Sequence, residues 1–179
     1  MTDVRAATSD DARVIADINV RSWRHAYRGI IPDSYLEALD EAAIARRVRD
    51  VVLSGSATIL VAASPEVRGF SWMSPSRDDD AQSETAEIVA IYVDPQYERR
   101  GLGRALALAS CDVARSQGFT RIGLWVFDEN AIARAFYEAL EFAPDGRTKT
   151  TSHWGGVPIR EVRYVRPTTT HLEEVPLSS

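Results

Sequence analysis

The stretch Ala86 to Leu108, AEIVAIYVDPQYERRGLGRALAL, decides how the rest of the chain can be arranged. Its first part, Glu87 to Val93, is short, apolar and rich in β-branched and aromatic residues, which predicts a buried strand. From Arg104 the sequence is rich in alanine and leucine at helical spacing, which predicts a helix with one apolar stripe. The stretch is therefore a strand, a turn and a helix.

The turn between this strand and helix has the composition of an anion-binding site. Gly101 and Gly103 let the backbone turn tightly and approach a ligand closely. The first N–H groups of a helix have no intrahelical partner and lie at the positive end of its dipole, so phosphate binds there readily. Three arginines, Arg99, Arg100 and Arg104, add positive charge. This pattern predicts a cradle for a diphosphate.

A simpler interpretation of the same residues is a capped helix with solvated arginines, because a lone G-x-G is a weak motif. Two better-known phosphate motifs fit poorly. A P-loop needs a Gly-Lys pair, which this turn lacks. A dinucleotide fingerprint needs G-x-G-x-x-G directly after the strand. Here Leu106 stands at the third glycine position, and a loop that contains Pro95 separates the strand from the glycines.

Residues 93–106 resemble motif A of the GNAT superfamily, the acetyl-CoA-dependent N-acetyltransferases. The family pattern is [QR]-x-x-G-x-[GA] after a strand that ends V-x-P-x-Y. Here VDPQY (93–97) leads into RGLGRAL (100–106). The sequence departs from the pattern at Glu98, which replaces the Gln or Arg. This change weakens a side-chain contact at most, since the cradle consists of backbone N–H groups.

Residues 130–142, NAIARAFYEALEF, are similar to a second GNAT signature, N-x-x-A-x-x-F-Y-x-x-x-G-F. Glu141 replaces the family's glycine, so we expect this helix end to be strained or closed differently. Two motifs in the family's order are far more specific than either alone. The resemblance extends over about residues 2–166.

The resemblance implies that acetyl-CoA lies where strand 87–93 diverges from strand 121–127. Tyr137 would meet the thioester sulfur and protonate the departing thiolate. Something must also accept a proton from the amine, and Glu87 is the candidate base; an exposed carboxylate at a strand end is an equally good interpretation of Glu87. The residues expected to contact acetyl-CoA are Ile91, Tyr92, Val93, Arg99, Arg100, Gly101, Leu102, Gly103, Arg104, Ala105, Asn130, Ala133, Phe136 and Tyr137. Asn130 also suits a helix N-cap, and the two roles are compatible.

The resemblance also implies that the acceptor amine enters from the other side, between the Trp23 to Tyr35 segment and the Lys149 to Val157 loop. Trp23, Tyr27, Tyr35 and Trp154 are the candidate lining residues. Packing in the hydrophobic core is the alternative role for these aromatic residues.

Composition limits the classes of function. The chain has 179 residues, of which 45% are hydrophobic and 26% charged, and a net charge of -5, as in an ordinary globular domain. The acidic balance argues against a nucleic-acid partner. No apolar run resembles a signal peptide or a membrane span, so we expect a cytoplasmic protein. Cys111 is expected to be a buried, inert thiol. The histidines lack metal-ligand spacing, so we expect no metal.

The predicted elements run β-α-α-β-β-β-α-β-α-β-β. Hairpin-forming strands in the middle of the chain require a mixed sheet with helices on both faces. We therefore expect an α/β (α+β mixed) GNAT fold: a central, mostly antiparallel sheet with a splay between the two strands that hold acetyl-CoA. One domain is expected over residues 2–166, with a disordered tail at 167–179 and a mobile loop from Ser74 to Thr85.

The function predicted from these features is transfer of acetyl from acetyl-CoA to a primary amine of a small molecule or peptide, by direct attack in a ternary complex. Two alternatives stay open: an acyl-CoA-binding regulator of the same fold without turnover, and a nucleotide-binding domain. The sequence leaves the acceptor and the oligomeric state open, a homodimer included.

Overall fold

A seven-stranded sheet runs through the part of the chain that the computed structural model describes, residues 3–63 and 65–168. The strands follow the spatial order β1-β2-β3-β4-β5-β7-β6. All neighbouring strands are antiparallel except β4 and β5, which are parallel, so the expected mixed and mostly antiparallel sheet is confirmed. The strands are β1 (Asp3–Ala6), β2 (Thr58–Ala63), β3 (Val67–Pro75), β4 (Thr85–Val93), β5 (Arg121–Phe127), β6 (Ala143–Thr151) and β7 (Ile159–Pro167).

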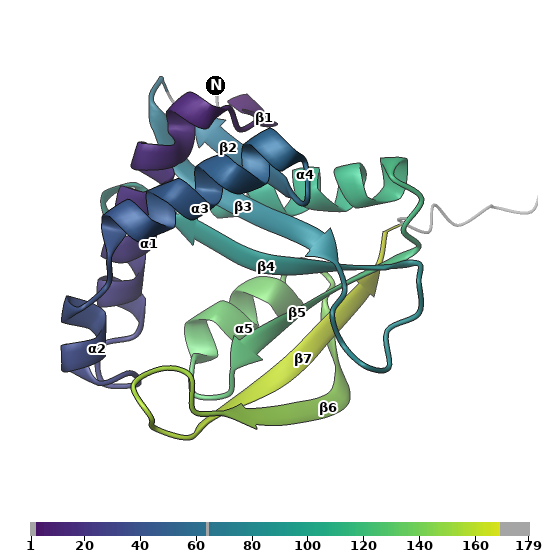
Figure 1. Cartoon of the computed structure of the whole chain (residues 1–179). Coiled ribbons are helices and arrows are strands. Elements are labelled where there is room, and N and C mark those ends of the chain that lie inside the picture. The colour runs from purple at the N-terminus through teal and green to yellow at the C-terminus, as the bar shows by residue number, and fades with distance from the viewer. Residues whose placement is uncertain (1–2, 64, 169–179) are drawn as a thin grey trace, which may run out of the picture.

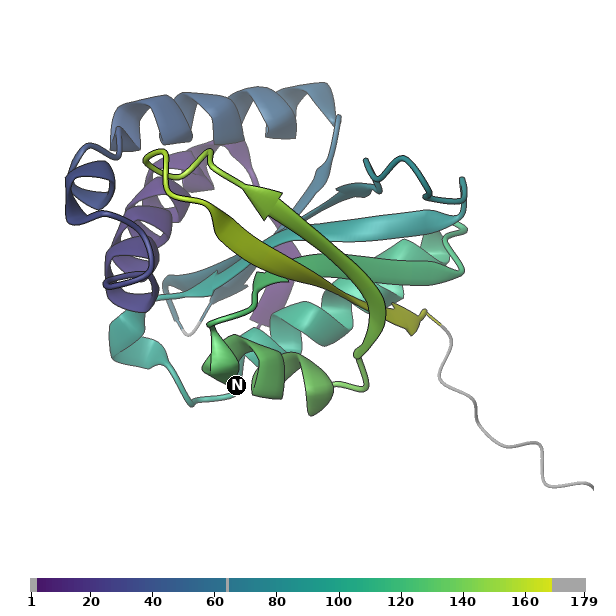
Figure 2. The ribbon, with the colours of Figure 1, turned by 90° about the horizontal axis from the view of Figure 1, so that it is seen from below.

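Helices cover both faces of this sheet, as predicted. Helices α1 and α3 lie on one face, and α4 and α5 lie on the other (Figures 1 and 2). The helices are α1 (Ala12–Ala26), α2 (Asp33–Glu37), α3 (Glu41–Ser54), α4 (Leu102–Ser116) and α5 (Ala131–Glu138), with 3-10 turns η1 at Ser9–Asp11 and η2 at Pro95–Tyr97. The element order matches the predicted one except that the second predicted helix is two helices, α2 and α3. The Asp40 side chain caps α3 by accepting from the Ala43 N–H.

Two apolar clusters hold the layers together. Ile15, Val61 and Phe70 pack between α1, α3 and the sheet. Leu124 and Tyr164 belong to the cluster on the α4 and α5 side. Because successive residues of a strand point to opposite faces, the continuously apolar strands seen in the sequence supply both clusters at once.

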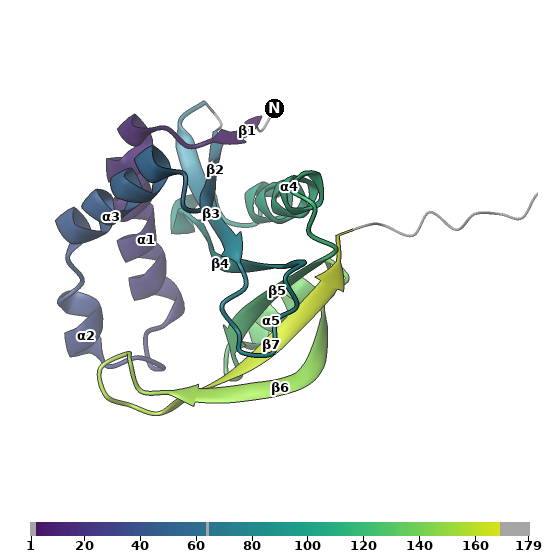
Figure 3. The same ribbon diagram turned by 45° about the vertical axis from the view of Figure 1, so that its right-hand side comes forward.

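The parallel strands β4 and β5 separate after a short paired segment. Register pairs run only from Thr85 with Arg121 to Ile88 with Leu124. Beyond that point β4 continues alongside β3, and β5 continues alongside β7, so the two strands diverge (Figures 1 and 3). A bulge at Val89 accompanies the separation, since Trp72 pairs with Ala90 and Met73 with Ile88. The predicted splay is confirmed, and it leaves one edge of the end of β4 without a partner strand.

The segment 76–84 between β3 and β4 is tied to the far half of the sheet. The Arg163 guanidinium on β7 lies 3.1 Å from Asp78, 2.7 Å from Asp80 and 2.7 Å from Asp145. The Trp125 indole also donates to Asp78 at 3.0 Å. The sequence predicted a loop here but gave no sign of these anchors, because Arg163 is distant in the chain.

The expected C-terminal tail falls mainly on residues 169–179, outside the described residues. Its first two residues belong to the fold: Pro167 is the last residue of β7, and Thr168 is buried and donates its backbone N–H to the Thr120 carbonyl at 3.0 Å. Of the helices in the described ranges, none combines the length and apolarity that crossing a membrane requires.

Candidate functional site

The turn before α4 presents unpaired backbone N–H groups. Gly101 caps the helix with φ +83°, a conformation that favours glycine. The Ala105 N–H closes the first helical turn by donating to the Gly101 carbonyl at 3.0 Å. The N–H groups of Leu102, Gly103 and Arg104 precede it and have no backbone acceptor among the described residues, as the first residues of a helix require.

The basic side chains of this turn are free to meet an anion. Within the described ranges, Arg99, Arg100 and Arg104 form no ion pair. Arg100 stacks over the Tyr97 ring at 4.9 Å, and Arg99 adopts φ +58°, which is unusual for a residue other than glycine. The turn therefore combines free N–H groups with unpaired positive charge in an acidic protein.

Gly103 lies where α4 packs against α5 and β4. A Cβ at this position would lie 3.4 Å from the Phe136 ring and 3.7 Å from Val93. A larger side chain would thus collide with Phe136 first.

A buried carboxylate that the sequence analysis did not single out orients this turn. Asp94, 1% exposed, accepts from the Gln96 N–H at 3.1 Å and from Arg21 on α1 at 3.0 Å. Ser22 donates its hydroxyl to the Val93 carbonyl at 2.9 Å. Helix α1 therefore fixes the end of β4 and the start of the turn. Asp94 lies inside the first motif, where its spacing before Pro95 and Gln96 suits a cap.

The second motif forms α5. The Asn130 side chain caps this helix by accepting from the Ala133 N–H at 3.0 Å, so the predicted N-cap is present. Glu141 takes the left-handed conformation, φ +65°, that the family's glycine would take. Arg166 supports this end by binding the Leu140 carbonyl at 2.7 Å and the Glu141 carboxylate at 3.2 Å. The helix end keeps the conformation of a glycine cap at some cost in backbone strain.

Three tyrosines, two on one side of the sheet and one on the other, lie near the divergence of β4 and β5. The Tyr27 and Tyr92 hydroxyls, on the α1 side of the sheet, are 3.1 Å apart. Tyr137 comes from α5 on the opposite side, and its hydroxyl bonds to no described residue. Burial raises the pKa of Tyr137, and the nearby Tyr27 raises it further. Burial likewise raises the pKa of Tyr92, with contributions from Tyr27 and Tyr137.

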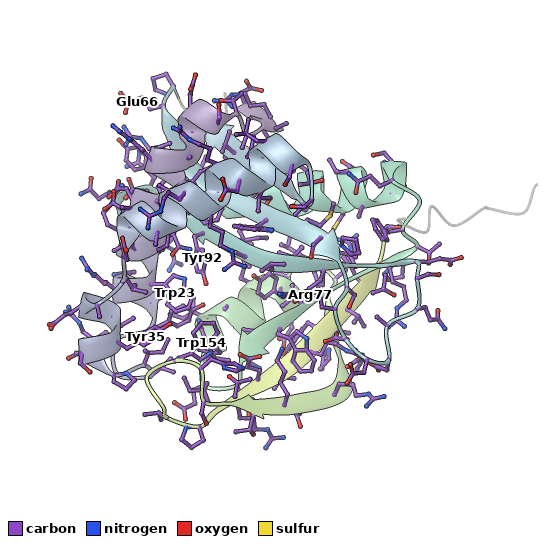
Figure 4. All side chains as sticks on the ribbon, in the orientation of Figure 1. Trp23, Tyr35, Glu66, Arg77, Tyr92 and Trp154 are labelled. Atoms are coloured by element: carbon purple, nitrogen blue, oxygen red, sulfur yellow. The ribbon has the colours of Figure 1, made fainter. Side chains whose placement is uncertain are left out.

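The four aromatic residues predicted to line the acceptor site lie together. The Trp23 ring is 5.2 Å from Tyr27 and 5.0 Å from Trp154, and Tyr35 is 6.4 Å from Trp154. Figure 4 shows Trp23, Tyr35, Tyr92 and Trp154 directed toward the same region between α1, α2 and the sheet. The Phe127 ring lies 4.8 Å from Tyr27. We call the following six residues the aromatic cluster: Trp23, Tyr27, Tyr35, Tyr92, Phe127 and Trp154.

The loop that carries Trp154 packs closely against α2. A Cβ on Gly155 would come within 3.1 Å of Pro32 and 3.2 Å of Tyr35, and Gly155 has φ +74°. A glycine is thus needed for Trp154 to reach the cluster. The aromatic residues were predicted from the sequence, whereas this contact was not.

Glu87, the candidate base, is a buried carboxylate in an ion pair. Arg77 of the β3–β4 segment binds both of its oxygens, with nitrogen–oxygen distances of 2.9 and 3.2 Å, and the Arg77 N–H lies 3.4 Å from Oε2. Glu87 is therefore 7% exposed, which differs from the exposed strand end considered above. Arg77 is a partner of Glu87 that was not predicted from the sequence, because it lies in a polar segment without a motif.

Comparisons with known proteins agree with this geometry. The profile of the acetyltransferase (GNAT) family matches residues 18–142. YuaI, an uncharacterized N-acetyltransferase of Bacillus subtilis (strain 168), is 30% identical over 164 residues, which are 90% of this chain and 91% of the relative.

Solved structures share the fold. PaiA N-acetyltransferase of Thermoplasma acidophilum, determined in complex with coenzyme A, has a TM-score of 0.70 at 20% identity and covers 90% of this chain and 98% of its own. YncA of Salmonella typhimurium, determined with acetyl-CoA, has a TM-score of 0.71 at 22% identity and covers 96% of each chain. The family match over most of the chain, together with the seven-stranded sheet and its splay, shows that this protein belongs to the acetyltransferase (GNAT) family, the acetyl-CoA-dependent acetyltransferases.

Proposed function

We propose that the protein transfers the acetyl group of acetyl-CoA to a primary amine of a small molecule or peptide, by direct attack in a ternary complex. The observation that carries this proposal is the splay of β4 and β5, with the free N–H groups at the start of α4 on one side of the sheet and the aromatic cluster on the other. A donor bound on the α4 and α5 side and an acceptor bound on the α1 side would meet at this point.

The donor half is supported by the free groups around the start of α4. The N–H groups of Leu102, Gly103 and Arg104, with the unpaired arginines of the turn, suit the diphosphate of acetyl-CoA. The unpaired edge of β4 at Ile91 and Val93 suits an extended chain that carries amide groups. Phe136 and Ala133 on α5 lie beside this edge and provide an apolar wall.

The chemistry requires one proton donor and one proton acceptor. The amine nitrogen attacks the thioester carbon, and the resulting anionic intermediate collapses as the carbon–sulfur bond breaks. Tyr137, whose raised pKa keeps its hydroxyl protonated near neutral pH, would protonate the thiolate. Glu87, directly or through water, would take the proton that the amine loses. Cys111 is buried within α4, and burial raises the pKa of its thiol, which favours direct attack over an acyl-cysteine intermediate.

The proposal is tested by acetyl-CoA binding followed by turnover. At a concentration about 100 times its dissociation constant, acetyl-CoA should stabilise the protein by about 2.7 kcal/mol, measured as a rise in melting temperature, whereas NAD should not. Release of CoA thiol is then followed across a panel of primary amines. Binding without release for any amine would favour the regulator without turnover, and no stabilisation by millimolar acetyl-CoA would refute the proposal.

A further inference from the structure

Glu161 on β7 is a buried carboxylate beside the aromatic cluster. Ile159 and Glu161 point to the same face of the sheet because they are two residues apart in one strand. Ile159 packs with Tyr27 and Trp154. Glu161 is only 6% exposed, and nothing in the sequence motifs distinguishes it. A charge at this depth requires a partner or a function.

The pairing of β5 with β7 places Glu161 next to Phe127, which contacts Tyr27. The register partner of Glu161 on β5 is Phe127, and the Phe127 and Tyr27 rings are 4.8 Å apart. Burial is the main cause of the raised pKa of Tyr27, and the Glu161 charge raises it further. Tyr27 in turn bonds to Tyr92 at 3.1 Å. Glu161 therefore lies on the acceptor side of the three tyrosines.

The ion pair of Glu161 differs from that of Glu87. Arg77 binds both oxygens of Glu87, which leaves that carboxylate well occupied. Glu161 has a single cationic contact in the described ranges, with the Lys149 ammonium at 3.1 Å from Oε2. Since a carboxylate can accept about four hydrogen bonds, Glu161 retains unused capacity.

The position of Lys149 indicates that the surroundings of Glu161 suit an organic cation. Its ammonium lies between the Glu161 carboxylate and the face of Trp125, 4.0 Å from the ring centroid. A carboxylate together with an aromatic face is a good environment for an organic cation. The Lys149 side chain is 40% exposed, so a ligand ammonium can reach Glu161 from solvent by replacing it.

Buried donors nearby lack acceptors. The indole N–H of Trp154 and the hydroxyl of Thr151 are buried without a hydrogen-bond partner among the described residues. Trp23 and Trp154 are in ring contact at 5.0 Å, and Thr151 is paired in register with Ile159. Unpaired buried donors are rare in native proteins, so a ligand oxygen here would relieve them.

We propose that Glu161 binds the protonated acceptor amine, and that the acceptor is a primary ammonium on an apolar body that also carries a neutral oxygen such as an amide carbonyl. The inference rests on the proposed function, since it identifies the acceptor class of the same site. Glu161 recruits the ammonium, the aromatic cluster contacts the apolar body, and the free indole and hydroxyl donors bind the oxygen. Loss of the proton before attack is left to Glu87 or water.

Three probes of matched size test the inference by binding: phenylalanine amide, phenethylamine and 3-phenylpropanamide. The first carries both the ammonium and the amide oxygen, the second lacks the amide, and the third lacks the ammonium. Dissociation constants are measured by NMR titration of the protein saturated with CoA. The parent protein should bind phenylalanine amide about 10- to 100-fold more tightly than 3-phenylpropanamide, and more tightly than phenethylamine.

Variants assign this preference to Glu161. Glu161→Gln should reduce the preference for the ammonium to less than about threefold, whereas Glu161→Asp should retain part of it. Lys149→Gln removes the competing ammonium and should tighten phenylalanine amide binding about two- to fivefold, whereas a structural ion pair would predict weaker binding. Glu129→Gln, at an exposed carboxylate, removes the same charge as a control and should change nothing.

The outcomes separate this inference from the proposed function. If the parent shows no preference for the ammonium, or if Glu161→Gln keeps it, the inference is overturned. Should Glu161→Gln fail to fold, the other two variants decide. An unchanged ammonium preference in Glu161→Asp, or weaker phenylalanine amide binding in Lys149→Gln, overturns the inference. CoA release is recorded with the same amines. A preference for the ammonium without turnover supports the inference and refutes the proposed acetyl transfer. Turnover with an unchanged acceptor KM in Glu161→Gln supports acetyl transfer and overturns the inference.

Discussion

Replacing Tyr137 with phenylalanine removes one hydroxyl from the divergence of β4 and β5 and leaves the ring in place. The ring packs 5.1 Å from Phe136 and 5.8 Å from Phe142, and both contacts survive the change. The hydroxyl bonds to no described residue, so we expect the free energy of unfolding to change by less than about 1 kcal/mol. Acetyl-CoA affinity should also stay within about threefold of the parent value.

The turnover rate should fall strongly in this variant. General acid catalysis contributes about 10²- to 10⁴-fold, equivalent to about 3–5 kcal/mol of barrier. The loss should appear in kcat more than in the acetyl-CoA KM, because the interaction strengthens as the sulfur gains charge. Since burial raises the pKa of Tyr137 above its usual value near 10, its hydroxyl stays protonated, and the parent should show no decline from this group below about pH 10.

Steady-state kinetics between pH 6 and 10, with an amine that the parent acetylates, measure both effects. Tyr92→Phe is the matched control: it removes the hydroxyl that bonds to Tyr27 at 3.1 Å, so it should cost about 1 kcal/mol of stability and much less rate. A kcat within threefold of the parent for Tyr137→Phe would mean that Tyr137 only packs, and that water or substrate protonates the thiolate.

Two further predictions concern the turn and the first helix. Gly103→Val should weaken acetyl-CoA binding by at least about tenfold in a calorimetric titration, because its larger side chain displaces Phe136, whereas Gly103→Ala, with ordinary contacts of 3.4 Å or more, should bind nearly as the parent. Equal affinity of both variants would mean that the packing of Phe136 against Gly103 does not shape the acetyl-CoA site. Arg5 lowers the pKa of Asp11 to about 2, mainly through its side-chain hydrogen bonds, so the ion pair stabilises the fold above pH 4 and loses this effect as pH falls toward 2. Arg5→Met should therefore lower the free energy of unfolding by about 1 kcal/mol at pH 7 and by almost nothing at pH 2, and a deficit independent of pH in urea titrations would contradict this reasoning.

The two motifs were readable because each is local. A strand, a glycine turn and a helix start follow one another between Glu87 and Arg104, so neighbouring residues determine their conformation. The same holds for the cap of α5 at Asn130 and for the left-handed residue that closes it, where Glu141 adopts the conformation expected of glycine. Periodicity also gave the order of strands and helices.

Tertiary structure alone decided which distant residues share the site. Tyr27 from α1 and Tyr92 from β4 are 65 positions apart in the chain, and their hydroxyls come within 3.1 Å only in the folded structure. Charged partners were equally hidden, since Arg77 binds Glu87 from a segment without a motif, and Glu161 pairs across strands with Lys149. The physical reason is that local propensities and spacing act over a few residues, whereas the burial and pairing of a charge depend on strands that meet only after the sheet has formed.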